Sequence, residues 1–165
     1  MTITSHELAA REEIRDVLFR YTRGIDRLDL DLVRSCYHAD AHDDHGAFKG
    51  DLEGFLAWVG DVLTYFDSTM HFIGNQLIEV DGGVAHVESY CVAYHRRGAY
   101  DGEEPYDLVT ALRYVDRLEH RGDRWRIADR VCVFDWSRRD PVVGEWAMDG
   151  AVRGRRGPDD PVWRP

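Results

Sequence analysis

The sequence has no long apolar run, few cysteines and no excess of positive charge. None of its apolar runs approaches the length needed to cross a bilayer, and its first residues lack the apolar core of a secretory signal. The formal net charge of -10 at pH 7 argues against nucleic-acid binding, because phosphate contacts need a basic surface. These absences predict a cytoplasmic protein that binds neither nucleic acid nor membranes.

The three cysteines and the glycines form none of the familiar cofactor motifs. Cys36, Cys91 and Cys132 are odd in number and widely spaced, which is typical of buried free thiols rather than of disulfides or a zinc site. The sequence has no glycine-rich phosphate loop and no Gly-x-Ser-x-Gly motif. We therefore expect no cofactor and no bound metal.

Apolar spacing predicts three helices in the first part of the chain. Apolar residues recur every three or four positions from Ile14 to Leu28, in a helix for which Ser5 is the candidate N-cap. A short helix is expected from Leu30 to about Tyr37, and a third after Gly50. The segment 38–50 between them is expected to be irregular or to form short strands.

From Met70 onward the pattern is that of extended strands. Four are expected, in two hairpins whose turn signals are Asp81-Gly82-Gly83 and Arg121-Gly122-Asp123. The predicted strands are Met70–Val80, Val84–Arg96, Asp107–Leu118 and Arg124–Trp136. Because the turns are short, the sheet is predicted to be antiparallel.

Helices followed by a curved sheet predict an α+β fold whose cone-shaped sheet encloses a pocket. One face of the strand 84–96 carries small residues, from Ala85 to Ala93, and ends at His95. This face leaves room for a ligand. One domain is predicted over residues 1–137, followed by a tail, 138–165, without its own core. The arginines of the tail, at 153, 155 and 156, are expected to be solvated.

Five residues could carry acid–base chemistry without a metal: Tyr21, Asp26, His71, His95 and Arg130. Each also has an ordinary structural explanation. Asp26 lies on the flank of its helix's apolar stripe, where a solvated carboxylate is common, and Tyr21 lies within the stripe, where a packed ring is common. His71 shares a predicted face with Ile73, Asn75 and Leu77. Counted outward from the turn, His71 and His95 are near neighbours, and Arg130 could hold an anion.

The cluster His42, Asp43, Asp44 and His45 is dense in potential metal ligands. Its spacing does not match a helical zinc site or a two-histidine, one-carboxylate site. A loop whose polar groups cap neighbouring elements is the better interpretation. Whether His42, His45 or Tyr37 reaches the pocket stays open.

Several runs of this chain resemble SnoaL-like proteins of the nuclear transport factor 2-like superfamily, over about residues 7–137. They are 21–29, 36–41, 70–75, 93–95 and 122–128. The resemblance implies a curved sheet on three helices. The pattern is most similar to that of scytalone dehydratase, bile-acid 7α-dehydratase and hexachlorocyclohexane dehydrochlorinase, in which a helix aspartate partners a strand histidine that acts as general base. Asp26 and His71 stand at the matching positions.

The same resemblance matches Tyr21 to a tyrosine of bile-acid dehydratase, His95 to the second histidine of scytalone dehydratase, and Arg130 to the late-strand arginine of the other two enzymes. It implies a cofactor-independent dehydratase acting on a small hydrophobic cyclic or polycyclic hydroxy-ketone. A polyketide cyclase or ring isomerase with the same residues is one alternative. A non-catalytic small-molecule binding module is the other.

Aromatic residues suggest a hydrophobic, ring-containing substrate, although core packing is the more common explanation for such residues. The candidate lining residues are Phe48, Phe55, Trp58, Phe72, Phe134 and Trp136. The resemblance further implies a homodimer or homotrimer, because open curved sheets often pair in this superfamily.

Overall fold

The computed structural model describes residues 3–144 and 147–163. Its elements match the predicted order of helices and strands, and the segment 38–50 forms short strands. They are α1 (Ser5–Arg27), α2 (Leu30–Ser35), β1 (Tyr37–Asp44), β2 (Lys49–Asp51), α3 (Leu52–Thr64), β3 (Ser68–Asp81), β4 (Val84–Arg97), β5 (Tyr106–Arg121), β6 (Arg124–Pro141) and the 3-10 turns η1 (Gly157–Asp159) and η2 (Pro161–Trp163). In the described ranges, no helix is both long enough and apolar enough to span a membrane.

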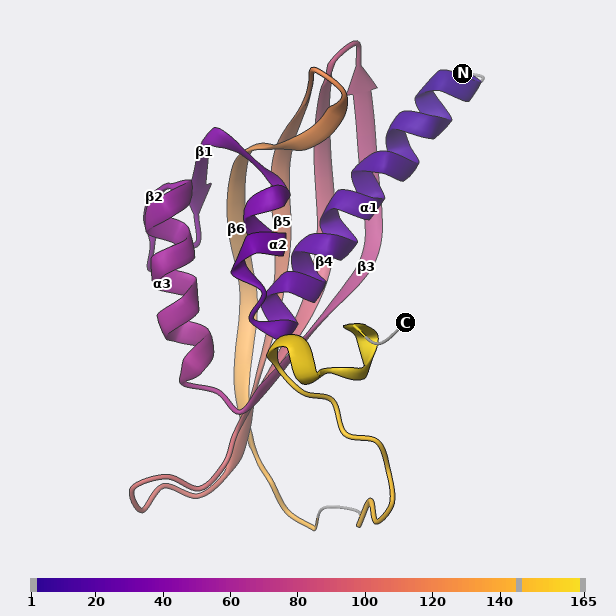
Figure 1. The fold of residues 1–165 in the computed structure, drawn as a ribbon. Helices are drawn as coiled ribbons and strands as arrows, with labels where there is room; N and C mark the ends of the chain where they lie inside the picture. The colour runs from indigo at the N-terminus through magenta and orange to yellow at the C-terminus, as the bar shows by residue number, and fades with distance from the viewer. Residues whose placement is uncertain (1–2, 145–146, 164–165) are drawn as a thin grey trace.

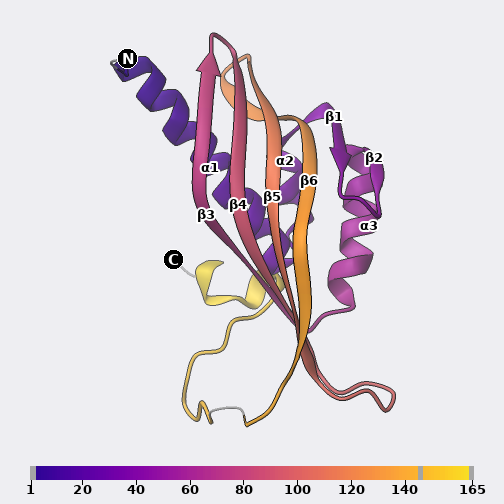
Figure 2. The ribbon, with the colours of Figure 1, turned by 180° about the vertical axis from the view of Figure 1, so that it is seen from behind.

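The strands form one curved sheet in the order β2-β1-β6-β5-β4-β3. The four long strands are antiparallel, as predicted, and Gly82 and Gly122 in the two hairpin turns have φ of 56° and 69°, which glycine adopts without a Cβ clash. The sheet is mixed overall, because β1 pairs parallel with β6. Figure 1 shows the helices on one face of this sheet, and Figure 2 shows the opposite face free of helices. Only the helix-covered face can therefore enclose a cavity.

Helix α1 has the predicted buried stripe and ends in a tight turn. Its N-cap is Thr4 rather than Ser5, since the Thr4 side chain accepts a hydrogen bond from the Glu7 amide. Gly24 allows α2 to approach closely, because a Cβ there would lie 2.7 Å from Val33 Cγ2. The stripe contains Ile14, Val17, Leu18, Tyr21 and Ile25. This packing fixes the last turn of α1 against the sheet.

Strand β3 contains a bulge between Ile73 and Gln76. The prediction that one face runs from His71 to Leu77 is therefore wrong beyond the bulge. Leu77 is exposed and Ile78 is buried, because one extra residue reverses the alternation of side chains. The residues before the bulge keep His71 on the inner face.

The small-residue face of β4 is buried as predicted, and so are the three cysteines. Ala85, Val87, Ser89, Cys91 and Ala93 all lie in the interior. The free thiols are buried, and this burial raises their pKa values, to about 11 for Cys36 and about 12 for Cys91 and Cys132. All three are thus protonated, structural thiols at pH 7.

Candidate active site

A cavity of about 270 Å³ lies between the helices and the inner face of the sheet. Residues of α1, α3 and all four long strands line it, together with His45 from the segment after β1. Its walls are largely apolar, but Tyr21, His71 and His95 also line it. An apolar cavity with a few convergent titratable groups is the usual form of a small-molecule site.

Asp26 and His71 form a hydrogen-bonded pair at this cavity. His71 Nδ1 lies 2.7 Å from Asp26 Oδ1, and Asp26 also accepts hydrogen bonds from Thr69 Oγ1 and from the His71 backbone amide, both at 3.0 Å. A carboxylate can only accept, so Nδ1 carries the proton and donates it. Nε2 of the neutral ring is then left as the basic nitrogen. Within the described residues, His71 Nε2 has no hydrogen-bond partner.

His95 lies beside His71, as predicted from the hairpin. The two rings meet edge to face, with centroids 5.3 Å apart, and Phe66 packs on the other side of His95. Burial, and to a smaller extent repulsion from His71 when that ring is protonated, lowers the pKa of His95 to about 4. His95 is therefore neutral at pH 7 and adds no positive charge to the cavity.

The burial of neutral His95 predicts a pH-dependent stability. Between pH 7 and pH 5 the unfolded residue, with a pKa of 6.5, takes up a proton that folded His95 does not bind until the pH nears 4. Because the unfolded state binds more protons, stability falls as the pH falls, by about 2 kcal/mol over this range. Urea denaturation at both pH values should show this loss in the wild type and a smaller one in His95→Asn. An equal loss in both proteins would contradict it.

Arg130 occupies a different place from the one expected for an anion-binding group. Its side chain is fully buried and makes a two-pronged ion pair with Asp116, at 2.7 and 2.8 Å. The guanidinium carbon lies 4.1 Å from the ring centre of Tyr21 and 4.2 Å from that of Tyr114. Asp116 already neutralises the charge of Arg130, and Arg130 does not line the cavity. Arg130 therefore packs against the Tyr21 ring from outside the cavity.

Tyr21 does line the cavity, and its ring is buried among aromatic neighbours. Tyr37 and Tyr114 meet it edge to face, at 6.0 and 5.7 Å between centroids. Burial raises the pKa of Tyr21, although the charge on Arg130 opposes the shift. The Tyr21 hydroxyl is thus protonated and can donate a hydrogen bond to a ligand oxygen.

Two of the six candidate aromatic residues line the cavity. Trp58 lies in its wall, and Phe134, 53% exposed, lies where it opens to solvent. Phe48 and Phe55 pack beside Trp58 in the core instead.

The other two face outward. Phe72 is 65% exposed, because it follows inward-pointing His71 and successive side chains alternate. Trp136 is 49% exposed, because a bulge in β6 at Asp135 turns it away from the side of Phe134.

The end of β1 and the residue that follows it contribute a second histidine–aspartate pair, which the sequence alone did not identify. Asp43 is buried and accepts hydrogen bonds from His45 Nδ1 and, at 2.8 Å, from Tyr37 Oη. His42 and Asp44 point elsewhere, to Asp129 and to Lys49 respectively. The sequence of this segment has no periodicity that predicts which side chains point inward. Only the structure shows that His45 lines the cavity.

The C-terminal tail packs against the domain at the base of α1 and α3. Arg156 donates to the carbonyl oxygens of Leu63 and Phe66, at 2.8 and 2.6 Å, so it caps the end of α3 and is not a solvated residue as expected. Asp160 is buried and pairs with Arg27.

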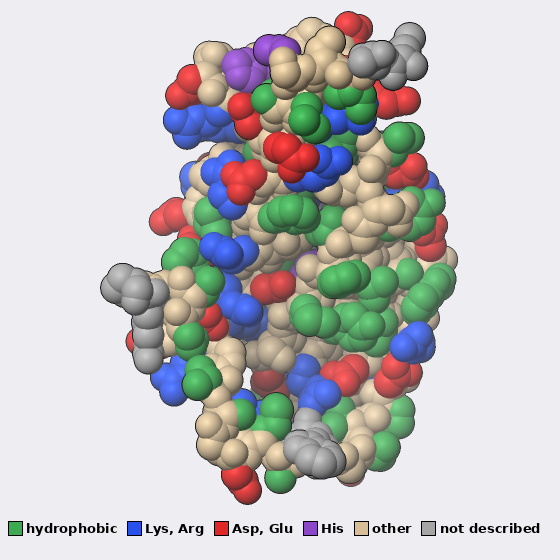
Figure 3. Space-filling view, turned by 90° about the vertical axis from the view of Figure 1, so that its right-hand side faces the viewer, with side chains coloured by type: hydrophobic (Ala, Val, Ile, Leu, Met, Phe, Trp, Pro, Cys, Tyr) green, Lys and Arg blue, Asp and Glu red, His purple; other side chains and the backbone are tan. Residues whose placement is uncertain are grey.

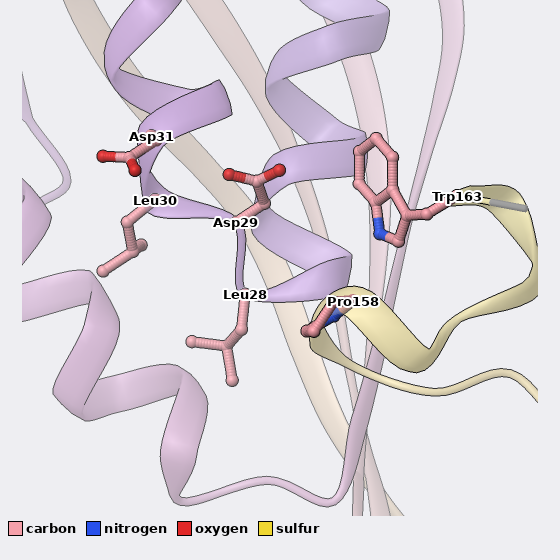
Figure 4. Close-up of a pocket in the computed structure, with 7 residues that line it drawn as sticks. Leu28, Asp29, Leu30, Asp31, Pro158 and Trp163 are labelled. Carbon is pink, nitrogen blue, oxygen red and sulfur yellow. The ribbon is translucent and has the colours of Figure 1, made fainter.

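A surface hollow of about 480 Å³ separates the tail from the turn between α1 and α2. Figure 4 shows Pro158 and Trp163 on one side of it and Leu28 and Asp29 on the other. The carboxylate of Asp29 caps the N-terminus of α2 by accepting a hydrogen bond from the Leu32 amide. We therefore do not assign a catalytic role to this hollow.

Comparison with known proteins decides the family. The sequence pattern of the SnoaL-like domain matches residues 6–131, which is most of the chain. The chain belongs to the SnoaL-like domain family. Uncharacterized proteins of Mycobacterium tuberculosis and Mycobacterium bovis are each 29% identical to this SnoaL-like protein over 128 residues, covering 76% of its chain and 85% of theirs.

Solved structures agree with this assignment at the level of the fold. A type 2 hexachlorocyclohexane dehydrochlorinase (LinA) is 21% identical, with a TM-score of 0.73 over 87% of this chain and 97% of its own. A proposed scytalone dehydratase from Novosphingobium aromaticivorans is also 21% identical, with a TM-score of 0.71 over 88% and 97%. The nuclear transport factor 2-like fold expected from the sequence is thereby confirmed. Family and fold support a related enzyme or ligand-binding role.

Proposed function

We propose that this SnoaL-like protein is a cofactor-independent lyase that eliminates water from a small hydrophobic cyclic hydroxy-ketone. The observation that carries the proposal is the pairing of Asp26 with His71. Asp26 accepts three hydrogen bonds and fixes the imidazole in the tautomer whose Nε2 is basic, at the wall of an apolar cavity. A module that only binds a ligand does not require an oriented base.

In this proposal His71 Nε2 removes a proton from a carbon next to a carbonyl group. Electron density then moves to the carbonyl oxygen, and Tyr21, kept protonated by burial, donates a hydrogen bond to that oxygen. Asp26 stabilises the imidazolium that forms. A positioned base contributes about 10²–10⁴-fold, and orientation in the closed cavity contributes further.

The polarity of the cavity supports the substrate class. Ten of the seventeen lining residues are apolar, and the others are two tyrosines, three histidines, a threonine and a cysteine. A bicyclic ketone matches this distribution, because its rings meet apolar walls while its few oxygens reach the polar groups.

A mass-spectrometric screen of hydroxylated cyclic ketones, steroids and polyketide-like aromatics tests the proposal. Wild-type protein should convert a member of this set with the loss of one water, and His71→Asn should not. An unchanged mass with a new retention time would instead indicate an isomerase or cyclase. Tight binding without conversion, equal in both proteins, would indicate a binding module.

We further propose that the protein forms a homo-oligomer in which the outer face of the sheet is the contact surface. Met70, Phe72 and Tyr94 are exposed there, with Met70 directly opposite Tyr94. Figure 3, with the β3 side of the molecule toward the viewer, shows hydrophobic side chains gathered at mid-height. Exposed apolar patches of this kind mark contact surfaces.

Phe72→Glu should reduce the particle to a single chain of 19.1 kDa, because it places a charge in an apolar contact. Light scattering after size exclusion measures the mass. Glu79→Ala, an exposed change on the same strand, should leave the oligomer intact. A wild-type mass of 19.1 kDa would contradict the proposal.

A further inference from the structure

The His45–Asp43 pair repeats the arrangement of His71–Asp26 at another part of the cavity wall. In each pair a largely buried aspartate accepts a hydrogen bond from the histidine Nδ1. The histidine side chains are 11% and 8% exposed, and both line the cavity. His45 directly follows β1 and His71 lies on β3, and β6, β5 and β4 lie between these two strands in the sheet. A molecule filling the cavity is thus reached by two imidazoles from different walls.

The contacts of His45 leave one ring nitrogen for a ligand. Phe55 stacks on the ring, with centroids 4.9 Å apart, and Asp43 holds Nδ1, while Tyr37 holds the other oxygen of Asp43. Among the residues that the structure describes, Nε2 of His45 bonds to none. The hydrogen bond from Tyr37 fixes the orientation of Asp43 and, through it, that of the His45 ring.

The buried charges behind His45 accommodate a proton on its ring. Asp43, Asp116 and Arg130 are all buried, and their formal charges sum to minus one. A protonated His45 would bring this group to neutrality. Asp43 and Asp116 are close enough to interact electrostatically with each other and with Arg130. With His71 as the base, the second imidazole is left for the opposite role, that of proton donor to the leaving oxygen.

We propose that His45, held by Asp43, is a second catalytic residue that protonates the leaving oxygen while His71 removes the carbon-bound proton. This inference rests on the proposed elimination. The C–H and C–O bonds break and a C=C bond forms; the C–H proton goes to His71 Nε2, and the hydroxyl leaves as water with the proton of His45. Proton exchange with solvent restores both imidazoles. The substrate class is then a β-hydroxy ketone, whose carbonyl oxygen is left for Tyr21.

Two probes that differ in their leaving group test this role. 3-Hydroxy-1-tetralone loses water to give fluorescent 1-naphthol, and its departing hydroxyl needs a proton. 3-Acetoxy-1-tetralone gives the same product, but acetate leaves without protonation. His45→Asn keeps a donor to Asp43 and removes Nε2. We expect it to slow the hydroxy probe by at least about 100-fold and the acetoxy probe by less than about threefold.

Two controls separate this inference from the proposed function. His71→Asn should slow both probes, because both need the base. His42→Asn, on β1 with an exposed side chain, should slow neither. Wild-type rates in His45→Asn with the hydroxy probe, or equal losses with both probes, would overturn the role of His45 and leave the proposed function standing. A wild-type protein that accelerates neither probe would overturn both.

Discussion

His71→Asn is expected to lower turnover by about 10²–10⁴-fold while leaving the fold intact. Asparagine places an amide nitrogen near the position of Nδ1, so the hydrogen bond to Asp26 can persist. It has no counterpart of Nε2, which is the basic atom at the cavity. Because the substitution removes the proton acceptor and little else, the loss should lie in kcat rather than in KM.

The measurement is the rate on whichever substrate the screen identifies, together with the unfolding midpoint of each variant. His86→Asn is the matched control, since His86 is an exposed histidine on the same sheet. Asp26→Asn should behave like His71→Asn, because an amide cannot accept all three hydrogen bonds that the carboxylate accepts. Wild-type turnover in His71→Asn would show that His71 is not the general base and would contradict the proposal.

Asp116→Ala is expected to destabilise the protein by about 3–5 kcal/mol. Asp116 and Arg130 are each fully buried and joined by two hydrogen bonds, and two tyrosine rings enclose the guanidinium. Burial works against the charge on Arg130, but Asp116 and the neighbouring tyrosines outweigh it and raise the Arg130 pKa well above its usual value. Without Asp116 the arginine stays charged and loses its two charge-assisted hydrogen bonds, so a guanidinium without a carboxylate in contact remains in the core.

Urea denaturation at pH 7 measures this loss. Glu88→Ala provides the comparison, because it breaks a partly exposed ion pair with Arg113 on the same sheet and should cost no more than about 1 kcal/mol. Replacing both buried partners, as in Asp116→Leu with Arg130→Met, should recover most of the stability, since no charge is left unpaired. A loss below about 1 kcal/mol for Asp116→Ala would contradict the account.

The local features of the fold could be predicted because they depend on short-range periodicity. The stripe on α1, the turns at Gly82 and Gly122 and the buried small residues of β4 all follow from residue spacing. The same alternation could have excluded Phe72 from the cavity once His71 was placed inside. Asp26 was different: its helix position left it on the flank, and resemblance to the family selected it.

The amino-acid sequence alone predicts which elements form and which face of each is apolar, whereas the polar groups that meet depend on how those elements pack. Arg130 shows the reason. Counted outward from the turn at Gly122, Asp116 would lie opposite Asp129, and Arg130 opposite Val115. A bulge between Ile127 and Asp129 shifts the register by one residue, so Asp116 lies opposite Arg130 instead.

His45 shows the same limit in a segment without periodicity. With its three neighbours it formed a group of four possible metal ligands, and only the packing of β1 against β6 and α3 turned Asp43 and His45 inward and His42 outward. Spacing along a chain fixes the direction of a side chain within one element. The partners across a sheet depend on register and on packing between elements. A single extra residue in one strand shifts the register and changes the cross-strand partner of each paired residue beyond it.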